Sequence, residues 1–338
     1  MTAPRIGVRV PPCARADAVA AAVARAEELG FAEAWLPDSQ LLWRDVYTTL
    51  TAAALSTSRI GLGTAVTNLE TRHVAVVASA ARSVAELAPG RFTLGIGVGN
   101  SSVGPVGLPP STGARMRDGF TALRALLAGQ DVDFNGTVSR LRDPVEVPLV
   151  MAASGPRNLR LAGEIADGAL LLSGISDATL ADAARRVGEG AEAAGRGPVP
   201  LVASAFCAVT DDVEKAARRL KPIVAGIAGT GGAKALALAG IELGDVPARI
   251  EGVYPDLVHA EDWDRAVEIC SRWVSDAAAA AFARSFCLFG TAAEITARLE
   301  GLGAAGIAGV YLQHVGSYDL PYELIESVGG EVLPGLRR

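Results

Sequence analysis

The residues best suited to chemistry stand directly after short apolar runs, where strands would deliver them to one end of a sheet. The clearest case is the segment 90–102, GRFTLGIGVGNSS, in which an alternating apolar run becomes rich in glycine and then polar. Gly97 and Gly99 would let the backbone approach a ligand closely, while Asn100 and Ser101 would offer hydrogen-bond donors. Because the pattern lacks the third glycine of the dinucleotide-binding fingerprint, an ordinary glycine turn explains it equally well.

Polar side chains follow the other apolar runs in the same way. They are Asp38, Ser39 and Gln40 after the second run, Thr67, Asn68, Arg72 and His73 after the third, Ser173 after the sixth, and Gln313 and His314 after the last. These residues also have structural explanations, since Asp38 can cap the next helix and Arg72 and His73 can be solvated residues of a first helical turn. His314 can equally be a hydrogen-bonded strand residue.

A candidate anion site follows the fifth apolar run. There Ser154 and Gly155 lead into Pro156, Arg157 and Asn158. Proline at the first helical position, after small polar residues, is typical of a helix start whose free N–H groups can bind an anion. The same features also serve simple capping. Together with the glycine-rich segment, this turn indicates a site for a large, flat and phosphorylated ligand.

Composition excludes several other classes of function. The net charge is −6 without a basic cluster, so we expect no nucleic-acid partner. The four cysteines are far apart and form no CxxC, and no metal-ligand cluster, Ser-His-Asp order or pair of glycosidase carboxylates stands out. No apolar run is long enough to span a membrane, and the first residues lack a signal-peptide pattern, so we expect no metal, no membrane and a cytoplasmic location.

The elements that would position these residues alternate between strand and helix. The expected strands are 5–10, 32–37, 59–66, 91–96, 148–153, 168–172, 200–209 and 308–315, and a helical pattern follows each of them. This α/β order predicts a (β/α)8 TIM barrel formed by one domain over 1–338, with a doubly wound open sheet as the competing architecture. The segment 211–284 has helical character and reads as an insertion between strands seven and eight, while 132–141 is expected to lie outside the barrel. The carboxyl ends of barrel strands form the active site, so the polar residues above would meet there.

Three blocks carry a resemblance to a known family. RIGLGTAVTNLETRH, ELAPGRFTLGIGVGNSS and MAASGPRNLRLAGEIADGALL occur in this order and stand at successive strand ends. Over nearly the whole chain the sequence resembles the bacterial luciferase-like monooxygenase superfamily, above all its deazaflavin-dependent branch, which includes methylenetetrahydromethanopterin reductase. This resemblance implies a barrel that is often dimeric and that binds coenzyme F420, a deazaflavin, or alternatively FMN.

The resemblance also assigns roles to residues. The flat ring would lie against Ala65, Val66, Thr67 and Asn68, where relatives have a cis peptide bond that here falls at Ala65-Val66, and near Asp38 and Ser39. The phosphate and the rest of the cofactor would contact Gly97, Gly99, Asn100, Ser101, Ser154, Gly155, Pro156, Arg157, Asn158 and Ser173. The family leaves most chemistry to the cofactor, while the protein holds the substrate against it and excludes water.

One position departs from the family. Many relatives carry Asp-His after the second strand, where the histidine can act as acid or base, but this chain has Asp38-Ser39. The candidate acids or bases are therefore Asp38, Gln40, His73 and His314. The leading hypothesis is an F420-dependent oxidoreductase that moves a hydride to or from a small imine, activated alkene or alcohol/carbonyl pair. The alternatives are an FMN-dependent monooxygenase that uses oxygen and a non-catalytic relative that only binds a flavin.

Overall fold

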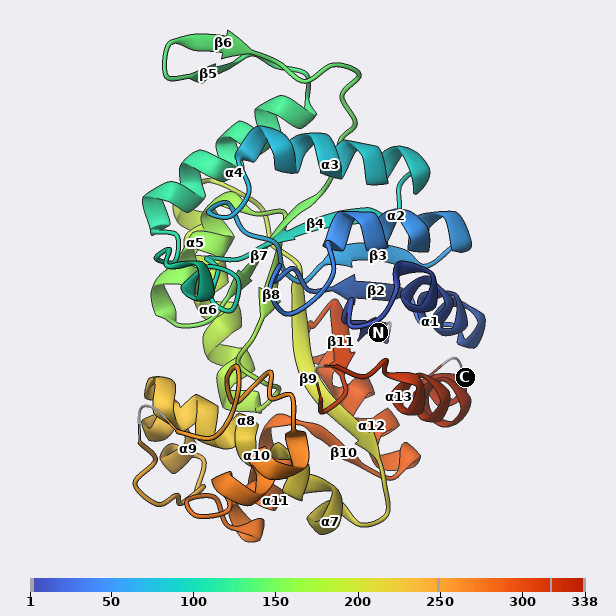
Figure 1. Ribbon diagram of the computed structural model, residues 1–338, viewed down its shortest axis with the longest axis vertical. Coiled ribbons are helices and arrows are strands. Elements are labelled where there is room, and N and C mark those ends of the chain that lie inside the picture. The colour runs from blue at the N-terminus through green and yellow to red at the C-terminus, as the bar shows by residue number, and fades with distance from the viewer. Residues whose placement is uncertain (1–2, 248–249, 317, 337–338) are drawn as a thin grey trace.

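Eight parallel strands form a closed barrel at the centre of the molecule (Figure 1). The computed structural model describes residues 3–247, 250–316 and 318–336. In sheet order the barrel strands are β1 (Arg5–Arg9), β2 (Glu33–Leu36), β3 (Gly61–Thr64), β4 (Phe92–Ile96), β7 (Leu149–Ala153), β8 (Gly168–Leu171), β9 (Leu201–Val209) and β11 (Gly309–Gln313). Pairing of β8 with β9 and of β11 with β1 closes the sheet on itself. The predicted TIM barrel is thus confirmed, and the open sheet is excluded.

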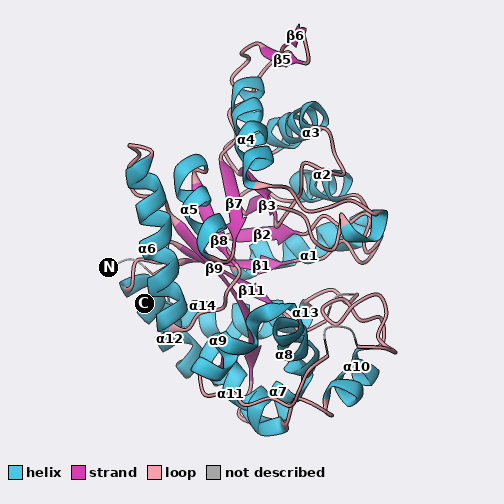
Figure 2. Ribbon diagram, turned by 90° about the vertical axis from the view of Figure 1, so that its left-hand side faces the viewer, coloured by secondary structure: helices cyan, strands magenta, loops and turns pink. Residues whose placement is uncertain are grey.

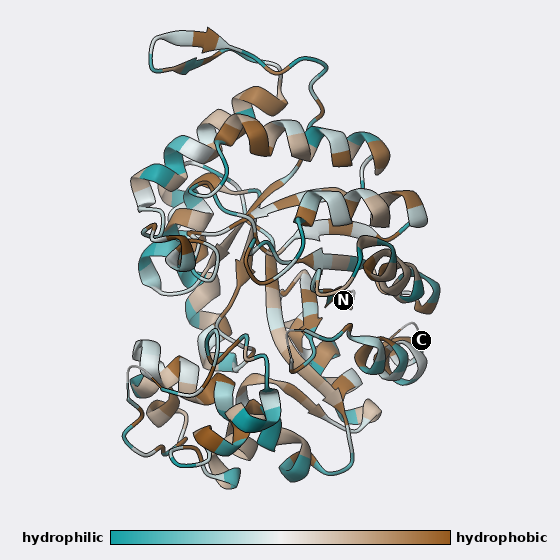
Figure 3. Ribbon diagram, viewed as in Figure 1, coloured by the Kyte–Doolittle hydropathy of each residue, from teal (hydrophilic) through white to brown (hydrophobic). Residues whose placement is uncertain are grey.

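Helices surround this barrel, as the turned view in Figure 2 shows. They are α1 (Ala16–Leu29), α2 (Val46–Ser56), α3 (Val74–Leu87), α4 (Gly113–Leu127), α5 (Pro156–Ile165), α6 (Asp177–Ala193), α12 (Ala292–Ala304), α13 (Tyr322–Ser327) and α14 (Leu333–Leu336), with short turns η1 (Gly104–Val106) and η4 (Val328–Val332). Sequence signals set several of their ends. Thr291 and Glu294 form a complete capping box at the start of α12. The helices carry hydrophobic and hydrophilic residues in alternation along their length (Figure 3), because one face of each packs on the sheet.

The main core lies between the barrel and these helices, whereas a small separate cluster fills the barrel itself. That inner cluster contains Trp35, Val150, Ala152, Leu170 and Tyr311. Its largest ring requires a glycine on the neighbouring strand, because a Cβ at Gly63 would lie 2.5 Å from the ring of Trp35. These side chains fill the barrel interior below the carboxyl ends of the strands, where active sites of such barrels lie.

The segment between β9 and β11 folds beside the barrel on a hydrophobic cluster of its own. It contains α7 (Val213–Ala217), η2 (Arg218–Leu220), α8 (Lys221–Ile227), η3 (Ala228–Gly232), α9 (Ala233–Leu238), α10 (Trp263–Cys270), α11 (Asp276–Phe286) and the strand β10 (Leu288–Gly290). Phe206 and Ala208 of β9 pack against this cluster, so the carboxyl-terminal half of this strand joins the segment to the barrel. The prediction of one domain over 1–338 stays a prediction.

Two details differ from or extend the expected order of elements. The strand β10 extends the sheet by pairing with the end of β9 and had not been expected, because three residues are too short for a periodic signal. The predicted extra element of the fourth connection is an antiparallel hairpin, β5 (Val132–Phe134) and β6 (Thr137–Ser139), and it projects from the barrel (Figure 1). No helix of the described residues has the length and apolar character that a membrane span requires.

Candidate functional site

A cavity of about 210 Å³ opens at the carboxyl ends of the barrel strands. Of the predicted site residues, those that line it are Asp38, Ser39, Ala65, Val66, Thr67, Gly97, Gly99, Asn100, Ser101, Ser154 and Asn158. The loops after four strands, β2, β3, β4 and β7, thus meet as the barrel prediction requires. Ligand sites typically measure about 300–1,000 Å³, so this cavity would enclose only part of a large cofactor.

The wall made by the segment after β3 is locked to β4. The peptide bond between Ala65 and Val66 is cis, at the position that the resemblance implies. Thr67 donates its N–H to the carbonyl of Gly95 at 2.9 Å and accepts from the N–H of Gly97 at 2.9 Å. A Cβ at Gly97 would lie 2.6 Å from the Cγ2 methyl of Val66, so glycine is needed there for close contact. The two segments therefore form one flat wall of small residues, which suits a planar ring.

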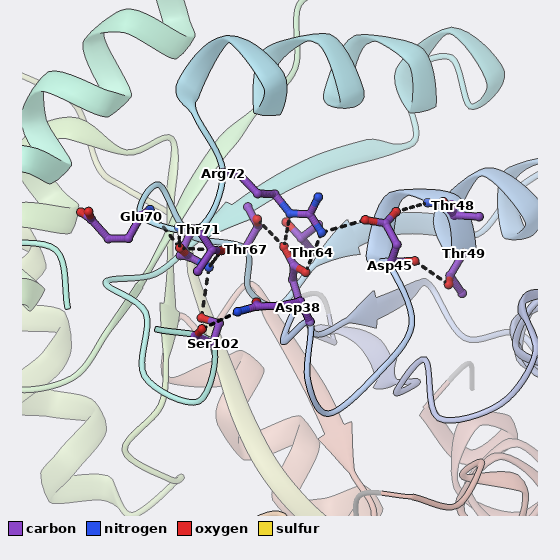
Figure 4. Close-up of polar contacts among 12 residues, drawn as sticks. Asp38, Asp45, Thr48, Thr49, Thr64, Thr67, Glu70, Thr71, Arg72 and Ser102 are labelled. Carbon is purple, nitrogen blue, oxygen red and sulfur yellow. Dashed lines mark hydrogen bonds and ion pairs between the residues drawn. The ribbon is translucent and has the colours of Figure 1, made fainter. Parts of the chain in front are cut away.

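Asp38 is held by a network of hydrogen bonds behind this wall. Figure 4 shows Asp38 and Arg72 pointing toward one another, with Asp45 on the far side of the guanidinium group. Arg72 donates through Nε to Oδ2 of Asp38 at 2.9 Å and through Nη2 to Oδ1 at 3.0 Å. The hydroxyl of Thr67 donates to Oδ2 of Asp38 at 2.7 Å. The side chain of Asp38 is only 2% exposed. Its hydrogen bonds with Arg72 and Thr67 fix the position of its carboxylate.

Arg72 is shared between two carboxylates. Its Nη2 also donates to Oδ2 of Asp45 at 2.8 Å, and its guanidinium lies over the ring of Tyr47, 5.2 Å from the centroid. Burial opposes the charged form, yet the contacts with Asp38 and Asp45 raise the pKa of Arg72. The expected alternative of Asp38 as a helix cap is wrong, because the N-cap of α2 is Asp45, whose side chain accepts from Thr48. Arg72 is not a solvated first-turn residue either.

The loop after β4 is tied to the loops after β2 and β3 by side chains. Ser39 and Ser101 share a hydrogen bond of 2.8 Å, and Gln40 Nε2 donates to the carbonyl of Ser102 at 2.6 Å. Asn68 Nδ2 donates to the hydroxyl of Ser102 at 3.0 Å. Gln40 and Asn68 therefore support the wall rather than line the cavity. Their predicted roles as catalyst and ring contact remain predictions.

The predicted anion site is an open helix start. Helix α5 begins at Pro156, and its N-cap is Gly155, which has φ 72° and ψ 156° and provides no side-chain cap. A Cβ at Gly155 would meet nothing within 4 Å, and Ser154, Gly155, Pro156 and Arg157 are exposed. Because Ser154 and Asn158 line the cavity, this helix start lies at its rim. Ser173 does not line the cavity, and its neighbour Leu172 does.

The two predicted histidines, His73 and His314, do not line this cavity. His73 is exposed and caps α3, accepting from the N–H of Ala75 at 3.3 Å, which is the structural alternative given for it above. His314 lies at the end of β11 and lines a second cavity of about 780 Å³ with Lys215, Arg219 and Asp319. Burial lowers the pKa of His314 to about 4, and the nearby charge of Arg9 acts in the same direction.

Sequence reasoning missed residues that complete the site. These are Arg9, Pro37, Val98, Ala152, Leu172 and His259, and the cavity is also lined by Trp43 and Ser102. His259 comes from the segment beside the barrel, and its ring meets the ring of Trp43 edge-on at 5.3 Å between centroids. Both carboxylate oxygens of Asp256 contact Nδ1 of His259, at 3.0 and 2.9 Å. No periodic signal marked His259, because its position in the barrel mouth depends on how a distant segment folds back.

Comparison with known proteins agrees with this geometry. A family model described as luciferase-like monooxygenase matches residues 1–309. The chain belongs to this family. The resemblance of the three sequence blocks is thus confirmed.

Two curated relatives are oxidoreductases by name, and one of them is named as F420-dependent. The chain is 35% identical over 212 residues to a 5,10-methylenetetrahydromethanopterin reductase of Methanolobus tindarius, which covers 59% of this chain and 64% of that protein. It is 41% identical over 169 residues to an F420-dependent glucose-6-phosphate dehydrogenase of Beutenbergia cavernae. This alignment covers 44% of this chain and 50% of that protein. Both matches span less than two thirds of the relative's own length.

A solved structure supports the fold along the whole chain. The coenzyme F420 dependent tetrahydromethanopterin reductase from Methanopyrus kandleri superposes with a TM-score of 0.78 over 99% of this chain and 100% of that one. The two sequences are 23% identical, so this likeness establishes the shared barrel architecture.

Within the described residues, no group of three or more histidine, cysteine, aspartate or glutamate side chains could hold a metal ion.

Proposed function

We propose that this protein is a coenzyme F420-dependent oxidoreductase that moves a hydride between the deazaflavin and a small organic substrate. The observation that carries the proposal is that one cavity joins a flat wall of small residues to an open helix start. The wall suits a planar ring, and the helix start suits a phosphate. The relative of Beutenbergia cavernae supports F420 as the cofactor, because it is named an F420-dependent glucose-6-phosphate dehydrogenase.

The residues present fit such a cofactor. Ala65, Val66 and Gly97 would hold the ring face, because nothing larger than a valine side chain projects from this wall. The N–H groups of the first turn of α5 and the hydroxyl of Ser154 would hold the phosphate, and Arg157 could pair with its charge. Asp38, fixed by Arg72, would hold the edge of the ring. When bound, the deazaflavin would supply the hydride acceptor or donor.

His259 is the residue best placed to move a proton in this reaction. Asp256 fixes Nδ1 of His259, as a carboxylate orients the general base of a catalytic triad, and leaves Nε2 for the substrate. Burial opposes ionisation of Asp256, but its hydrogen bond with His259 lowers the pKa of that carboxyl. In an alcohol-to-carbonyl reaction Nε2 of His259 would take the hydroxyl proton. His259 would thereby replace the histidine that many relatives carry where this chain has Ser39.

Titration of the purified protein with coenzyme F420 and with FMN, side by side, tests the cofactor. Carbon in place of N5 makes the deazaflavin a hydride carrier that does not form the oxygen adduct of a monooxygenase. We expect the deazaflavin to bind at least tenfold more tightly, which is about 1.4 kcal/mol. Tighter binding of FMN with oxygen-dependent turnover would favour the second candidate, an FMN monooxygenase, which the name of the matching family supports.

The proposal extends to the state and setting of the protein. A homodimer that acts on small molecules in the cytoplasm, without a nucleic-acid partner, is consistent with the net charge of −6 and with the family resemblance. Sedimentation velocity tests the dimer, for which we expect a mass of twice the 34.6 kDa chain.

A further inference from the structure

Arg9 brings a positive charge to the mouth of the barrel. It is the last residue of β1, it is half-buried, and it lines the same cavity as Asp38, Trp43 and His259. Its guanidinium lies over the ring of Trp43, with Cζ 5.1 Å from the centroid. This cation–π contact holds the plane of the group in place without using its hydrogen-bond donors.

This charge has no counterion among the residues that the structure describes. No ion pair or hydrogen bond joins the Arg9 side chain to another described residue, although a guanidinium group carries five N–H donors. Asp38 lines the same cavity, but Arg72 and Thr67 already occupy both of its oxygens. Burial lowers the pKa of Arg9 to about 10, so it is still charged at neutral pH. A partly desolvated cation without a partner is costly, which points to a ligand that supplies the anion.

The phosphate of the proposed cofactor does not supply that anion. In the closed sheet, three strands separate β1 from β7 in either direction, β2, β3 and β4 on one side and β11, β9 and β8 on the other. Arg9 on β1 therefore stands across the barrel mouth from the helix start that follows β7. The neighbours of Arg9 include Trp43 and, through that ring, His259, as well as Cys13, Tyr311 and His314.

We infer that Arg9 binds an anionic group of the substrate, a carboxylate or a phosphate ester. The inference rests on the proposed function and names its substrate class: small hydroxy or oxo compounds, or imines, that carry such a group. Trp43 touches both Arg9 and His259, so one ring sets the separation between the anion-binding group and the proton-moving group. A planar guanidinium fork can bind either kind of anion through two hydrogen bonds. The anion at Arg9 then orients the substrate so that its reacting carbon lies toward the wall of small residues.

Calorimetric titration of ligands without turnover tests this subsite. The probes are malate for a carboxylate, glycerol 3-phosphate for a phosphate ester and glycerol as the neutral counterpart, added to the protein with and without saturating reduced coenzyme F420, which cannot accept a hydride from these alcohols. We expect at least one anionic probe to bind the deazaflavin-loaded protein ten times more tightly than glycerol, and the preferred probe tells carboxylate from phosphate. Arg9→Met should weaken the binding of that anionic probe at least tenfold and leave the affinity for glycerol unchanged. Arg9→Lys should weaken the binding of the anionic probe less than Arg9→Met does.

The control is Arg59→Met, which removes an exposed arginine at the amino ends of the strands and should change no binding constant. Anion binding that survives in Arg9→Met, or that coenzyme F420 displaces, would place the anion at the start of α5 and overturn the inference. A loss of coenzyme F420 binding in Arg9→Met would assign Arg9 to the cofactor and overturn it as well. If the wild-type protein binds no deazaflavin, the proposed function fails, and the titrations without deazaflavin still decide whether Arg9 binds anions.

Discussion

His259 meets the ring of Trp43 edge-on, and this contact joins the segment beside the barrel to the loop after β2. The rings cross at 74°, with 5.3 Å between their centroids. Trp43 is 6% exposed and the side chain of His259 is 12% exposed, so the contact is nearly closed to solvent. The inserted segment therefore supplies one wall of the site and is more than an addition to its outside.

The first prediction concerns the acid–base role of His259. Loss of a general acid or base typically costs about 10²–10⁴ in rate, so His259→Gln should lower kcat at least a hundredfold in the oxidation or reduction of the best substrate from an alcohol and imine screen. Asp256→Asn should lower it less, because the ring stays in place. The dissociation constant for coenzyme F420 should be unchanged in both. His73→Gln, which alters an exposed helix cap, is the control, and full activity of His259→Gln would assign the proton to another group.

The second prediction concerns the open start of α5. Gly155 lies in a backbone region open only to glycine, at the point where the phosphate is proposed to bind. Gly155→Leu should weaken coenzyme F420 binding at least tenfold in a fluorescence titration. The matched control is Gly306→Leu, since Gly306 also has a positive φ, and an added Cβ there would also meet nothing within 4 Å, but it follows α12 away from the cavity. Equal affinities of the two variants would show that the effect is one of backbone strain alone, and wild-type affinity in Gly155→Leu would move the phosphate elsewhere.

The parts of the site that follow the barrel strands could be predicted, because the rule behind them is local. A strand buried on both faces is read from its apolar run, so Asp38, Thr67 and Ser154 were placed at the right end of the right strands. Arg9 was missed because a run such as RIGVR does not show which residue the barrel turns inward at its mouth. His259 was missed because its position depends on tertiary folding far along the chain. Asp38 and His73 were also ambiguous in sequence, and only the contacts of Asp45 and Ala75 resolved which residue caps which helix.

The third prediction concerns the ion pair behind the ring wall. Among the described residues, Arg72→Met would leave the buried carboxylate of Asp38 with the Thr67 hydroxyl as its remaining side-chain donor, and breaking such a pair costs about 3 kcal/mol or more. We expect that loss in the free energy of unfolding by urea at pH 7. The control, Arg15→Met, breaks a pair whose side chains are 83% and 69% exposed, so water replaces the lost contact and the free energy of unfolding should stay at the wild-type value. Asp38→Asn in the Arg72→Met background should recover part of the loss, and strict additivity of the two changes would contradict the coupling.

The last prediction concerns pH and His314. Its folded pKa of about 4 lies below the value of about 6.5 for an exposed histidine, so between these values the unfolded chain binds more protons than the folded one. Stability from this residue should be complete above about pH 6.5 and should fall as the pH drops toward about 4, with a slope of at most about 1.4 kcal/mol per pH unit for one group. Urea unfolding of the wild type and of His314→Gln at pH 7 and pH 4.5 measures the difference. Because glutamine does not titrate, the His314→Gln variant should lose less stability between the two pH values than the wild type. Equal losses in wild type and His314→Gln would mean that His314 is accessible to protons in the folded protein and that the acid-sensitive groups are the carboxylates.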